Sequence, residues 1–370
     1  MNPIHSLSAI TPLPEFDLWG VPPTQLTVER VFDVEYRPIT AVDATSPIIF
    51  SFSSANDEYV KLDEIFLSWN VQLEFVKEGG AIDIQDYTKF NFMSYAMHSM
   101  IKQIELEINN KQISNLPQNY AYRAFLEALL GFSKNAKKTH LTTALWDDTF
   151  KTPIVASPDL KKSKVYHMMG KLHTDLAFQG RYLIEGCNLK LEISLNPPKF
   201  YLKLGDKVSA ILHISDVSLH VQKAKVSKET VEAHQKALEI LPVKYPITRV
   251  EVKKVVLPKG INDIYVENFI YSQIPRRMFV FLVDNEAFSG SYSKDPFYFQ
   301  PFNINHICAF IDGVSYPSQP YQPDFDQEKY MREYLGLFDA LNQNGTDVMC
   351  NIEKNIYKSN EAIFLFQFFF

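Results

Sequence analysis

One structural plan occurs twice in this chain, in two stretches that lie far apart in the sequence. In each stretch an alternating apolar run reaches a turn-forming pair of residues, and apolar residues at helical spacing follow after a loop. The first stretch alternates over 104–108, turns at Asn109-Asn110 and has helical spacing over 122–130. The second alternates over 307–311, has a strong hairpin signal at Asp312-Gly313 and resumes helical spacing over 331–338. Two tandem β-rich units of one design are the natural interpretation, and tandem sandwiches favour a building block over an active site.

Strand-like segments upstream extend the repeat. The segments 31–36 and 66–75 find counterparts in 249–257 and 277–284. Three further strands are predicted in the first half, at 171–178, 188–195 and 211–221. With the other short alternating runs between 26 and 225, the segments of the first half supply the roughly eight strands of a two-sheet sandwich.

The length of 370 residues exceeds the usual size of one core, so about two domains are expected. Residues 1–25 are broken by prolines and predict an extended arm, and 26–225 form the first sandwich. A linker helix is predicted over 226–242, with Ser227 as its cap and Pro242 ending it. The second sandwich takes 243–370.

The second sandwich is expected to be incomplete at its C-terminal end. From Tyr245 onward only five or six strands can be counted, whereas closing two facing sheets takes about eight. The segment 363–370 is aromatic, uncharged and strongly β-prone, so an open sandwich would tend to associate with other chains. We interpret the sequence as a truncated copy.

Composition excludes several classes of protein. A net charge of −6 disfavours a dedicated nucleic-acid site, and 28 Phe and 19 Tyr fit extensive buried β surface. The three cysteines, Cys187, Cys308 and Cys350, form no close pair, which favours a reducing compartment over a disulfide framework. No apolar run approaches the roughly 20 residues of a membrane helix, and no secretory signal opens the chain.

Residues that could carry chemistry are scattered. On a strand, His173 and Asp175 would point to the same side as a metal or acid–base pair, but a polar strand face is favoured because further ligands are not evident. Asp147-Asp148 could bind calcium, although a solvated acidic loop is the simpler interpretation. We therefore predict no catalytic residue, no cofactor and no metal.

Three features remain open to more than one interpretation. The basic runs are solvated loops, or contacts to nucleic acid or to a partner's acidic surface. The aromatic run is buried packing, an inter-subunit contact or a stacking platform, and the proline-rich segment is internal bracing or a segment that a partner grasps. These features are, in order, Lys134, Lys137 and Lys138 with Lys161, Lys162 and Lys164; the segment 297–302; and Tyr316, Pro317, Pro320, Tyr321 and Pro323.

Several segments resemble the major capsid (hexon-like) proteins of Polinton/Maverick elements and adintoviruses. The resemblance begins in the arm and spans about residues 15–350, and its specificity lies in the order and number of the matches. The segments are 15–25, 119–130, 136–141, 144–146, 170–176, 233–238, 244–247 and 283–292.

This resemblance implies an all-β fold of two tandem eight-stranded jelly-roll sandwiches (a double jelly roll) with a few short helices. It also implies a non-enzymatic structural subunit of an icosahedral virion, made and assembled inside the host cell. Its partners would be itself, as a homotrimer of near-hexagonal outline, neighbouring capsomers and a minor capsid or penton protein. One departure is that related chains continue with further strands, whereas this one stops at 368–370.

Three other functions remain open. A minor capsid protein would normally need only one sandwich, which the duplication argues against. A host-domesticated or degenerate capsid-derived protein could act as a binding module after losing assembly. An enzyme on a β-sandwich scaffold would need a convergent set of polar residues, and the sequence shows none.

Overall fold

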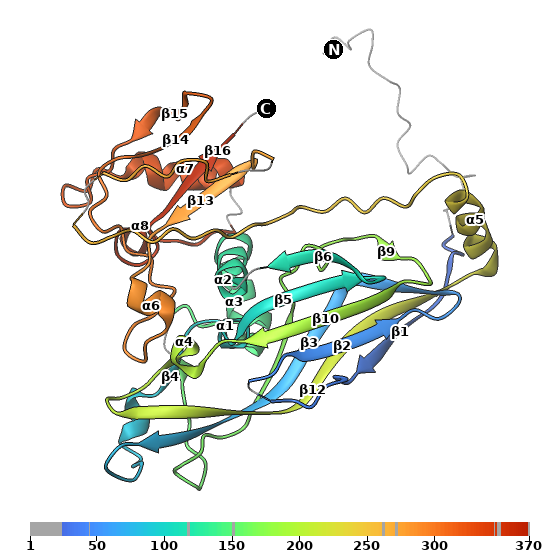
Figure 1. Ribbon diagram of the computed structural model, residues 1–370, viewed down its shortest axis with the longest axis horizontal. Helices are drawn as coiled ribbons and strands as arrows, with labels where there is room; N and C mark the ends of the chain where they lie inside the picture. Colours follow the sequence, from blue (N-terminus) through green and yellow to red (C-terminus); the bar gives the residue numbers. More distant parts are fainter. Residues whose placement is uncertain are drawn as a thin grey trace, which may run out of the picture.

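The computed structural model describes residues 24–43, 45–116, 119–149, 152–260, 263–270, 273–343, 345 and 349–368. Strands dominate the architecture and the helices are few and short, which confirms the expected all-β class (Figure 1). Most of the predicted arm, residues 1–23, lies outside the described part of the chain.

The first half forms a two-sheet sandwich. In one sheet the order is β1-β12-β3-β8, with β9 also pairing with β3, and in the other it is β2-β10-β5-β6. The short strands β4, β7 and β11 pair at one end. The bounds are β1 Val28–Tyr36, β2 Ile48–Ser53, β3 Glu58–Lys77, β4 Asn91–Phe92, β5 Ile101–Ile108, β6 Lys111–Leu116, β7 Thr152–Pro153, β8 Tyr166–Lys171, β9 Tyr182–Leu183, β10 Asn188–Leu195, β11 Leu202–Lys203 and β12 Val208–Val226.

The strand order of this sandwich is that of a jelly roll. If β1, β2, β3, β5, β6, β8, β10 and β12 are counted one to eight, the sheets read 1-8-3-6 and 2-7-4-5. The antiparallel pairs 1-8, 2-7, 3-6 and 4-5 are those of one long hairpin whose successive strand pairs fall in alternate sheets. We call this unit the first sandwich.

Local sequence explains the innermost hairpin. Asn109 and Asn110 both have positive φ angles, 50° and 62°, as the tight turn between β5 and β6 requires. The inward residues of β3 and β10 alternate with outward ones, so that one face of each strand joins the core.

Helices fill the connections of the first sandwich. The helix α2, which follows β6, carries the apolar face predicted over 122–130, and α5 lies within the predicted linker with Ser227 at its N-cap. The bounds are η2 Asp86–Lys89, α1 Ala96–Ser99, α2 Tyr120–Gly131, α3 Lys134–Lys138, η3 His140–Ala144, α4 Pro198–Tyr201 and α5 Lys228–Leu238.

The C-terminal part, residues 277–368, repeats the middle of the first sandwich. In the C-terminal part a hairpin of β14 and β15 is followed by α7, and β16 then returns to pair with β13. In the first sandwich the hairpin of β5 and β6 is likewise followed by α2, and β8 then returns to pair with β3. The turn between β14 and β15 is the predicted Asp312-Gly313, again with positive φ at both residues. The bounds are β13 Arg277–Phe281, α6 Asn285–Ser289, β14 Ile307–Ile311, β15 Val314–Tyr321, α7 Met331–Leu341, α8 Lys354–Ser359 and β16 Ile363–Gln367.

The strand predicted at 249–257 is wrong. This segment belongs to an extended connection that leaves α5 and crosses to the C-terminal part (Figure 1). In the first sandwich the corresponding strand is β1, which pairs with β12, the eighth strand. The described residues of the C-terminal part contain no counterpart of β12. Without a partner for its backbone groups, β propensity alone does not make a strand.

Two other expectations need correction. Only Lys171 of the predicted strand 171–178 lies on a strand, because the chain leaves β8 there and turns beneath α2. The C-terminal segment is a strand as predicted, but its described residues are not an exposed hazard: Ile363, Phe364 and Phe366 are all buried. They pair with β13 and pack under α7.

Candidate functional site: a buried polar cluster and the junction of the two halves

His173 and Asp175, which the sequence singles out, belong to a buried polar cluster beneath α2. Both side chains are almost fully buried, and they reach different partners rather than one shared ligand. Their segment turns instead of continuing β8, so the expectation that they share one strand face is wrong.

The first branch of the cluster is a carboxylate–imidazole–phenol chain. His173 Nδ1 lies 2.7 Å from Glu127 Oε2, and His173 Nε2 lies 2.9 Å from the Tyr95 hydroxyl. The carboxylate can only accept from Nδ1–H, so in the neutral imidazole Nε2 accepts from the Tyr95 O–H group. Burial opposes ionisation of Glu127, but hydrogen bonds from His173 and Arg123 prevail and lower the pKa of this carboxyl group.

A second branch joins His98 to the same residues. The Tyr120 hydroxyl accepts from the backbone N–H of His173 at 3.0 Å and is hydrogen-bonded to His98 Nδ1 at 2.9 Å. Burial, with the nearby His173, holds the pKa of His98 well below its usual range. A Cβ atom at Gly170 would lie 3.0 Å from His98 Nε2, so a larger residue there would have to displace this ring from its close approach to β8.

Arg123 closes the cluster from the inner face of α2. Its Nε donates to Glu127 Oε1 at 2.8 Å, and its Nη1 lies 2.8 Å from Asp175 Oδ1. The second contact is an ion pair without hydrogen-bond alignment, since neither Nη1 nor Oδ1 has a hydrogen-bond partner among the described residues. Both side chains are only 2–3% exposed, so each charge depends on the other.

This arrangement can brace the fold, but it is poorly suited to proton transfer with a substrate. Burial raises the pKa of Tyr95 well above its usual value, so this phenol is a weaker acid than in water. Of the three hydrogen-bonded side chains, Glu127, His173 and Tyr95, that of Glu127 is the most exposed, with 26% of its surface accessible. That the chain is not an enzyme stays a prediction.

The sequence pointed to two members of this cluster and missed the others. Arg123 and Glu127 stand at i and i+4 on a helix that is otherwise apolar, and this pair was the available signal. Tyr95, His98 and Tyr120 gave none, because aromatic residues on buried elements are ordinary core residues in a sequence.

The acidic pair Asp147-Asp148, considered above as a calcium site but interpreted as an acidic loop, is engaged in local hydrogen bonds. Asp147 Oδ1 accepts from both the backbone N–H and the hydroxyl of Thr149 at 2.7 Å, and Asp148 Oδ1 accepts from the Trp146 indole at 2.9 Å. No group of three or more potential metal-ligating side chains occurs within the part of the chain that the structure describes.

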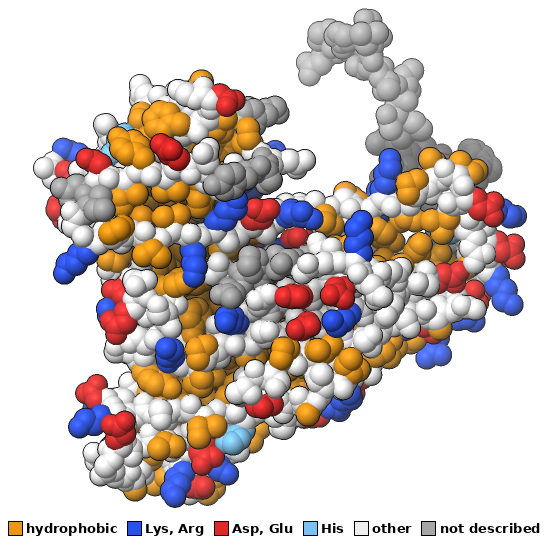
Figure 2. Space-filling model, in the orientation of Figure 1, with side chains coloured by type: hydrophobic (Ala, Val, Ile, Leu, Met, Phe, Trp, Pro, Cys, Tyr) orange, Lys and Arg blue, Asp and Glu red, His pale blue; other side chains and the backbone are white. Residues whose placement is uncertain are grey.

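One residue of the basic runs is not solvated. Lys137 is 1% exposed; its ammonium group donates to the carbonyl of Leu129 at 2.7 Å and to the side chain of Asn351 in the C-terminal part. Burial lowers the pKa of this lysine. The remaining basic residues are at least partly exposed, and Figure 2 shows basic and acidic side chains interspersed over the visible face.

The aromatic run at 297–302 packs at the junction of the two halves. Phe297 stacks on Phe125 of α2 with ring centroids 4.5 Å apart, and Phe299 lies 4.4 Å from Phe281 of β13. Because Phe297 and Phe299 are fully buried, the packing interpretation is confirmed for both. The first sandwich and the C-terminal part therefore share one hydrophobic core.

A buried acid lies at the same junction. Glu361 precedes β16, and burial raises its pKa to about 7, with Lys137 acting in the opposite direction. Burial also raises the pKa of the neighbouring Cys350 thiol to about 11. The junction is thus held together by apolar packing around a lysine and a carboxyl group whose charge changes near neutral pH.

The proline-rich segment lies largely on β15. Tyr321 is buried, and its hydroxyl donates to the carbonyl of Leu365 on β16 at 3.1 Å. This bond braces the C-terminal part from within.

The helices that the structure describes include none with the length and apolar character to cross a lipid bilayer.

Comparison with known proteins gives a distant relative and several structural likenesses. No protein-family profile matches the sequence. The chain is 24% identical over 352 residues to an uncharacterized protein of Caenorhabditis elegans, in an alignment that covers 92% of this chain and 84% of the relative.

Three solved structures of viral proteins are similar over part of the chain. The faustovirus major capsid protein is 9% identical with a TM-score of 0.41, covering 60% of this chain and 58% of that one. A chain of the virophage Sputnik is 11% identical with a TM-score of 0.42, covering 60% and 53%. The mavirus major capsid protein is 11% identical with a TM-score of 0.30, covering 75% and 56%. The matches thus span little more than half the length of these viral chains.

Proposed function

We propose that this chain is a structural major capsid subunit of a Polinton-like or adintovirus-like element and has no catalytic activity. The observation that carries the proposal is the repeated strand plan. The C-terminal part reproduces strands three to six of the first sandwich, with the same two antiparallel pairings and a helix between the fifth and sixth strands. Tandem jelly rolls of one design are suited to tiling a shell, because three chains then present six similar units.

The domain division belongs to the same proposal. An arm over 1–25, a first jelly roll over 26–225, a linker helix over 226–242 and a second jelly roll over 243–370 account for the repeat. The shared aromatic junction supports it, since two sandwiches that stand side by side in a shell need a rigid contact between them.

The assembly we propose is a homotrimer of near-hexagonal outline that contacts neighbouring capsomers and a minor capsid or penton protein in a virion capsid. Light scattering coupled to size exclusion tests the first step, with three times the mass of 42.7 kDa expected. Negative-stain images of that peak should show a near-hexagonal outline. A stable monomer at micromolar concentration, without larger species, would contradict the trimer.

A host-domesticated, capsid-derived binding module is the second candidate. The observation behind it is the similarity to a nematode protein over 92% of this chain, which a domesticated gene in an animal genome would explain. A genome-resident element would explain that similarity equally well. Neighbouring genes distinguish the two. A packaging ATPase and a protein-primed polymerase beside the gene would support a capsid subunit, and an isolated locus interrupted by introns would support domestication.

A further inference from the structure

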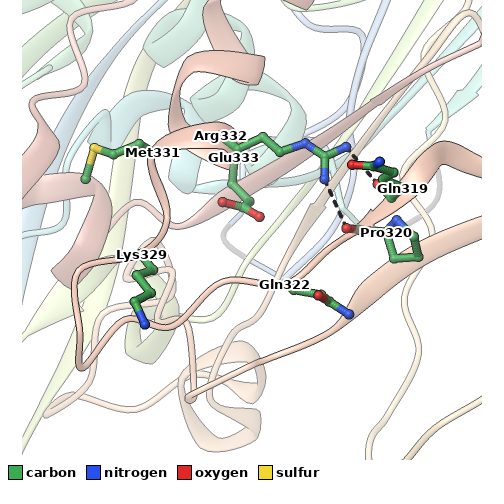
Figure 3. Close-up of a pocket in the computed structure, with 7 residues that line it drawn as sticks. All are labelled: Gln319, Pro320, Gln322, Lys329, Met331, Arg332 and Glu333. Atoms are coloured by element: carbon green, nitrogen blue, oxygen red, sulfur yellow. Dashed lines mark hydrogen bonds between the residues drawn. The ribbon is translucent and has the colours of Figure 1, made fainter.

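An open cavity of about 480 Å³ lies in the C-terminal part, between the end of β15 and the N-terminus of α7 (Figure 3). This volume is within the usual range of small-molecule sites. Its wall is mixed in character, with Gln319, Pro320 and Gln322 on one side and Lys329, Arg332 and Glu333 on the other. None of the chemistry described above involves it.

The two basic side chains at the cavity are held by partners within the chain. Arg332 donates from Nη2 to the carbonyl of Gln319 at 2.7 Å and from Nη1 to that of Pro320 at 3.1 Å. These two bonds are the dashed lines in Figure 3, where the guanidinium turns toward β15. Lys329 donates to the side chain of Gln327 at 2.5 Å. Both cations are therefore tied to the rim by internal acceptors.

Glu333 is different. It is 5% exposed, yet its carboxylate makes no hydrogen bond or ion pair with any residue that the structure describes. In Figure 3 the carboxylate points into the space between Lys329 and Gln322. Its oxygens are open to the cavity, so they place a negative charge there that no described residue pairs with, and this geometry suits a site for a complementary cationic group.

Among the described residues, the basic side chains at the cavity are Lys329 and Arg332, and both donate to other acceptors. Among the residues outside the described part, Lys151 is the one lysine or arginine. The next residue, Thr152, lies on β7, which pairs with β4 at the end of the first sandwich. A partner for Glu333 is therefore expected to come from another molecule.

We propose that this cavity binds a guanidinium or primary ammonium group, with the Glu333 carboxylate as its anionic acceptor. The planar fork of a guanidinium suits a carboxylate best, because two parallel N–H groups can reach both oxygens. The side-chain carbonyls of Gln319 and Gln322 supply neutral acceptors for the remaining N–H groups. This inference goes beyond the proposed capsid role and does not depend on it.

Titration calorimetry of the purified full chain at pH 7 with agmatine, a free guanidinium compound, tests the proposal. We expect wild type to bind agmatine and Glu333→Gln to bind it at least roughly tenfold more weakly, as for the loss of a charged hydrogen-bonded contact. Asp339→Asn, an exposed carboxylate on the same helix, is the matched control and should bind like wild type. Glu333→Asp, which keeps the charge and withdraws it by one methylene group, should fall between them.

A second arm identifies the source of the cation. Binding of the peptide acetyl-Gly-Arg-Gly-amide as well as agmatine would assign the site to a basic side chain of another protein, and binding of agmatine alone would assign it to a free small cation. Three results would overturn the proposal: folded wild type that binds neither probe, equal affinity in both Glu333 variants and wild type, or binding of the dianion glutarate in place of the cations. Circular dichroism of each variant establishes that it is folded, and Glu333→Asp serves alone if Glu333→Gln is not.

Discussion

Replacing Asp175 by alanine should destabilise the first sandwich strongly. The substitution removes the acidic partner of Arg123, whose guanidinium stays buried at 2% exposure, 2.8 Å from the vacated position. Arg123 keeps its contact with Glu127, but that carboxylate also accepts a hydrogen bond from His173. Glu127 alone therefore does not fully neutralise the charge of the Arg123 guanidinium. A buried guanidinium then lacks one of its two counter-ions.

The expected loss is about 3–5 kcal/mol, the usual cost of leaving one member of a buried ion pair unpaired. For a unit of this size about 2–4 °C in melting temperature corresponds to each kcal/mol, so the melting temperature should fall by roughly 6–20 °C.

Thermal melts followed by circular dichroism, at matched protein concentration, provide the measurement. The double variant Arg123→Met with Asp175→Leu should lie closer to wild type than Asp175→Ala does, because it removes both charges and leaves neither uncompensated. Glu29→Ala is the control: it breaks the exposed pair with Lys225 and should change little. If Asp175→Ala melts like wild type, the ion pair is not structural and the cluster must be reinterpreted.

Three further outcomes are expected. The pKa of Glu361 is raised from 4.5 to about 7, so its contribution to stability is fully present below about pH 4.5 and is lost as the pH rises through 7. Relative to wild type, the free energy of unfolding of Glu361→Gln, measured by urea titration, should therefore rise by about 3 kcal/mol between pH 4 and pH 8. If the unfolding free energies of the two proteins changed in parallel with pH, the raised pKa of Glu361 would be contradicted. Phe364→Ala should cost about 3–5 kcal/mol because the ring is 1% exposed, whereas Phe310→Ala, at 61% exposure, should be nearly neutral in the same titrations. In hydrogen-exchange mass spectrometry the segment 249–257 should exchange far faster than β12, and slow exchange would show that it pairs with another chain.

The sequence predicted those elements of the fold whose signals are local. The β5–β6 and β14–β15 hairpins are specified by alternation and by turn residues that tolerate positive φ, and the helices after them by apolar spacing. These signals need no knowledge of distant partners. The repeat could therefore be recognised before any strand pairing was known.

The errors arose where a partner distant in sequence decides the outcome. The segment 249–257 has the composition of a strand, but a strand forms only where another backbone receives its hydrogen bonds. The segment 172–178 alternates like a strand, but His173 and Asp175 contact side chains of α2, and His173 also contacts Tyr95, which precedes α1. The chain turns here to bring these polar side chains to their partners. No pattern within either segment contains that information.

The nested pairing of a jelly roll explains which part of each unit forms most readily. Strands four and five are joined by a tight turn, and strands three and six enclose them, whereas strands one, two, seven and eight must pair across nearly the whole unit. The C-terminal part contains the inner four strands, β13 to β16, in this arrangement. Its apolar surface is covered by α7 on one side, and Phe297 and Phe299 extend its core to α2 of the first sandwich. At the junction, α2 of the first sandwich therefore packs against the core of the C-terminal part and stabilises its inner strands.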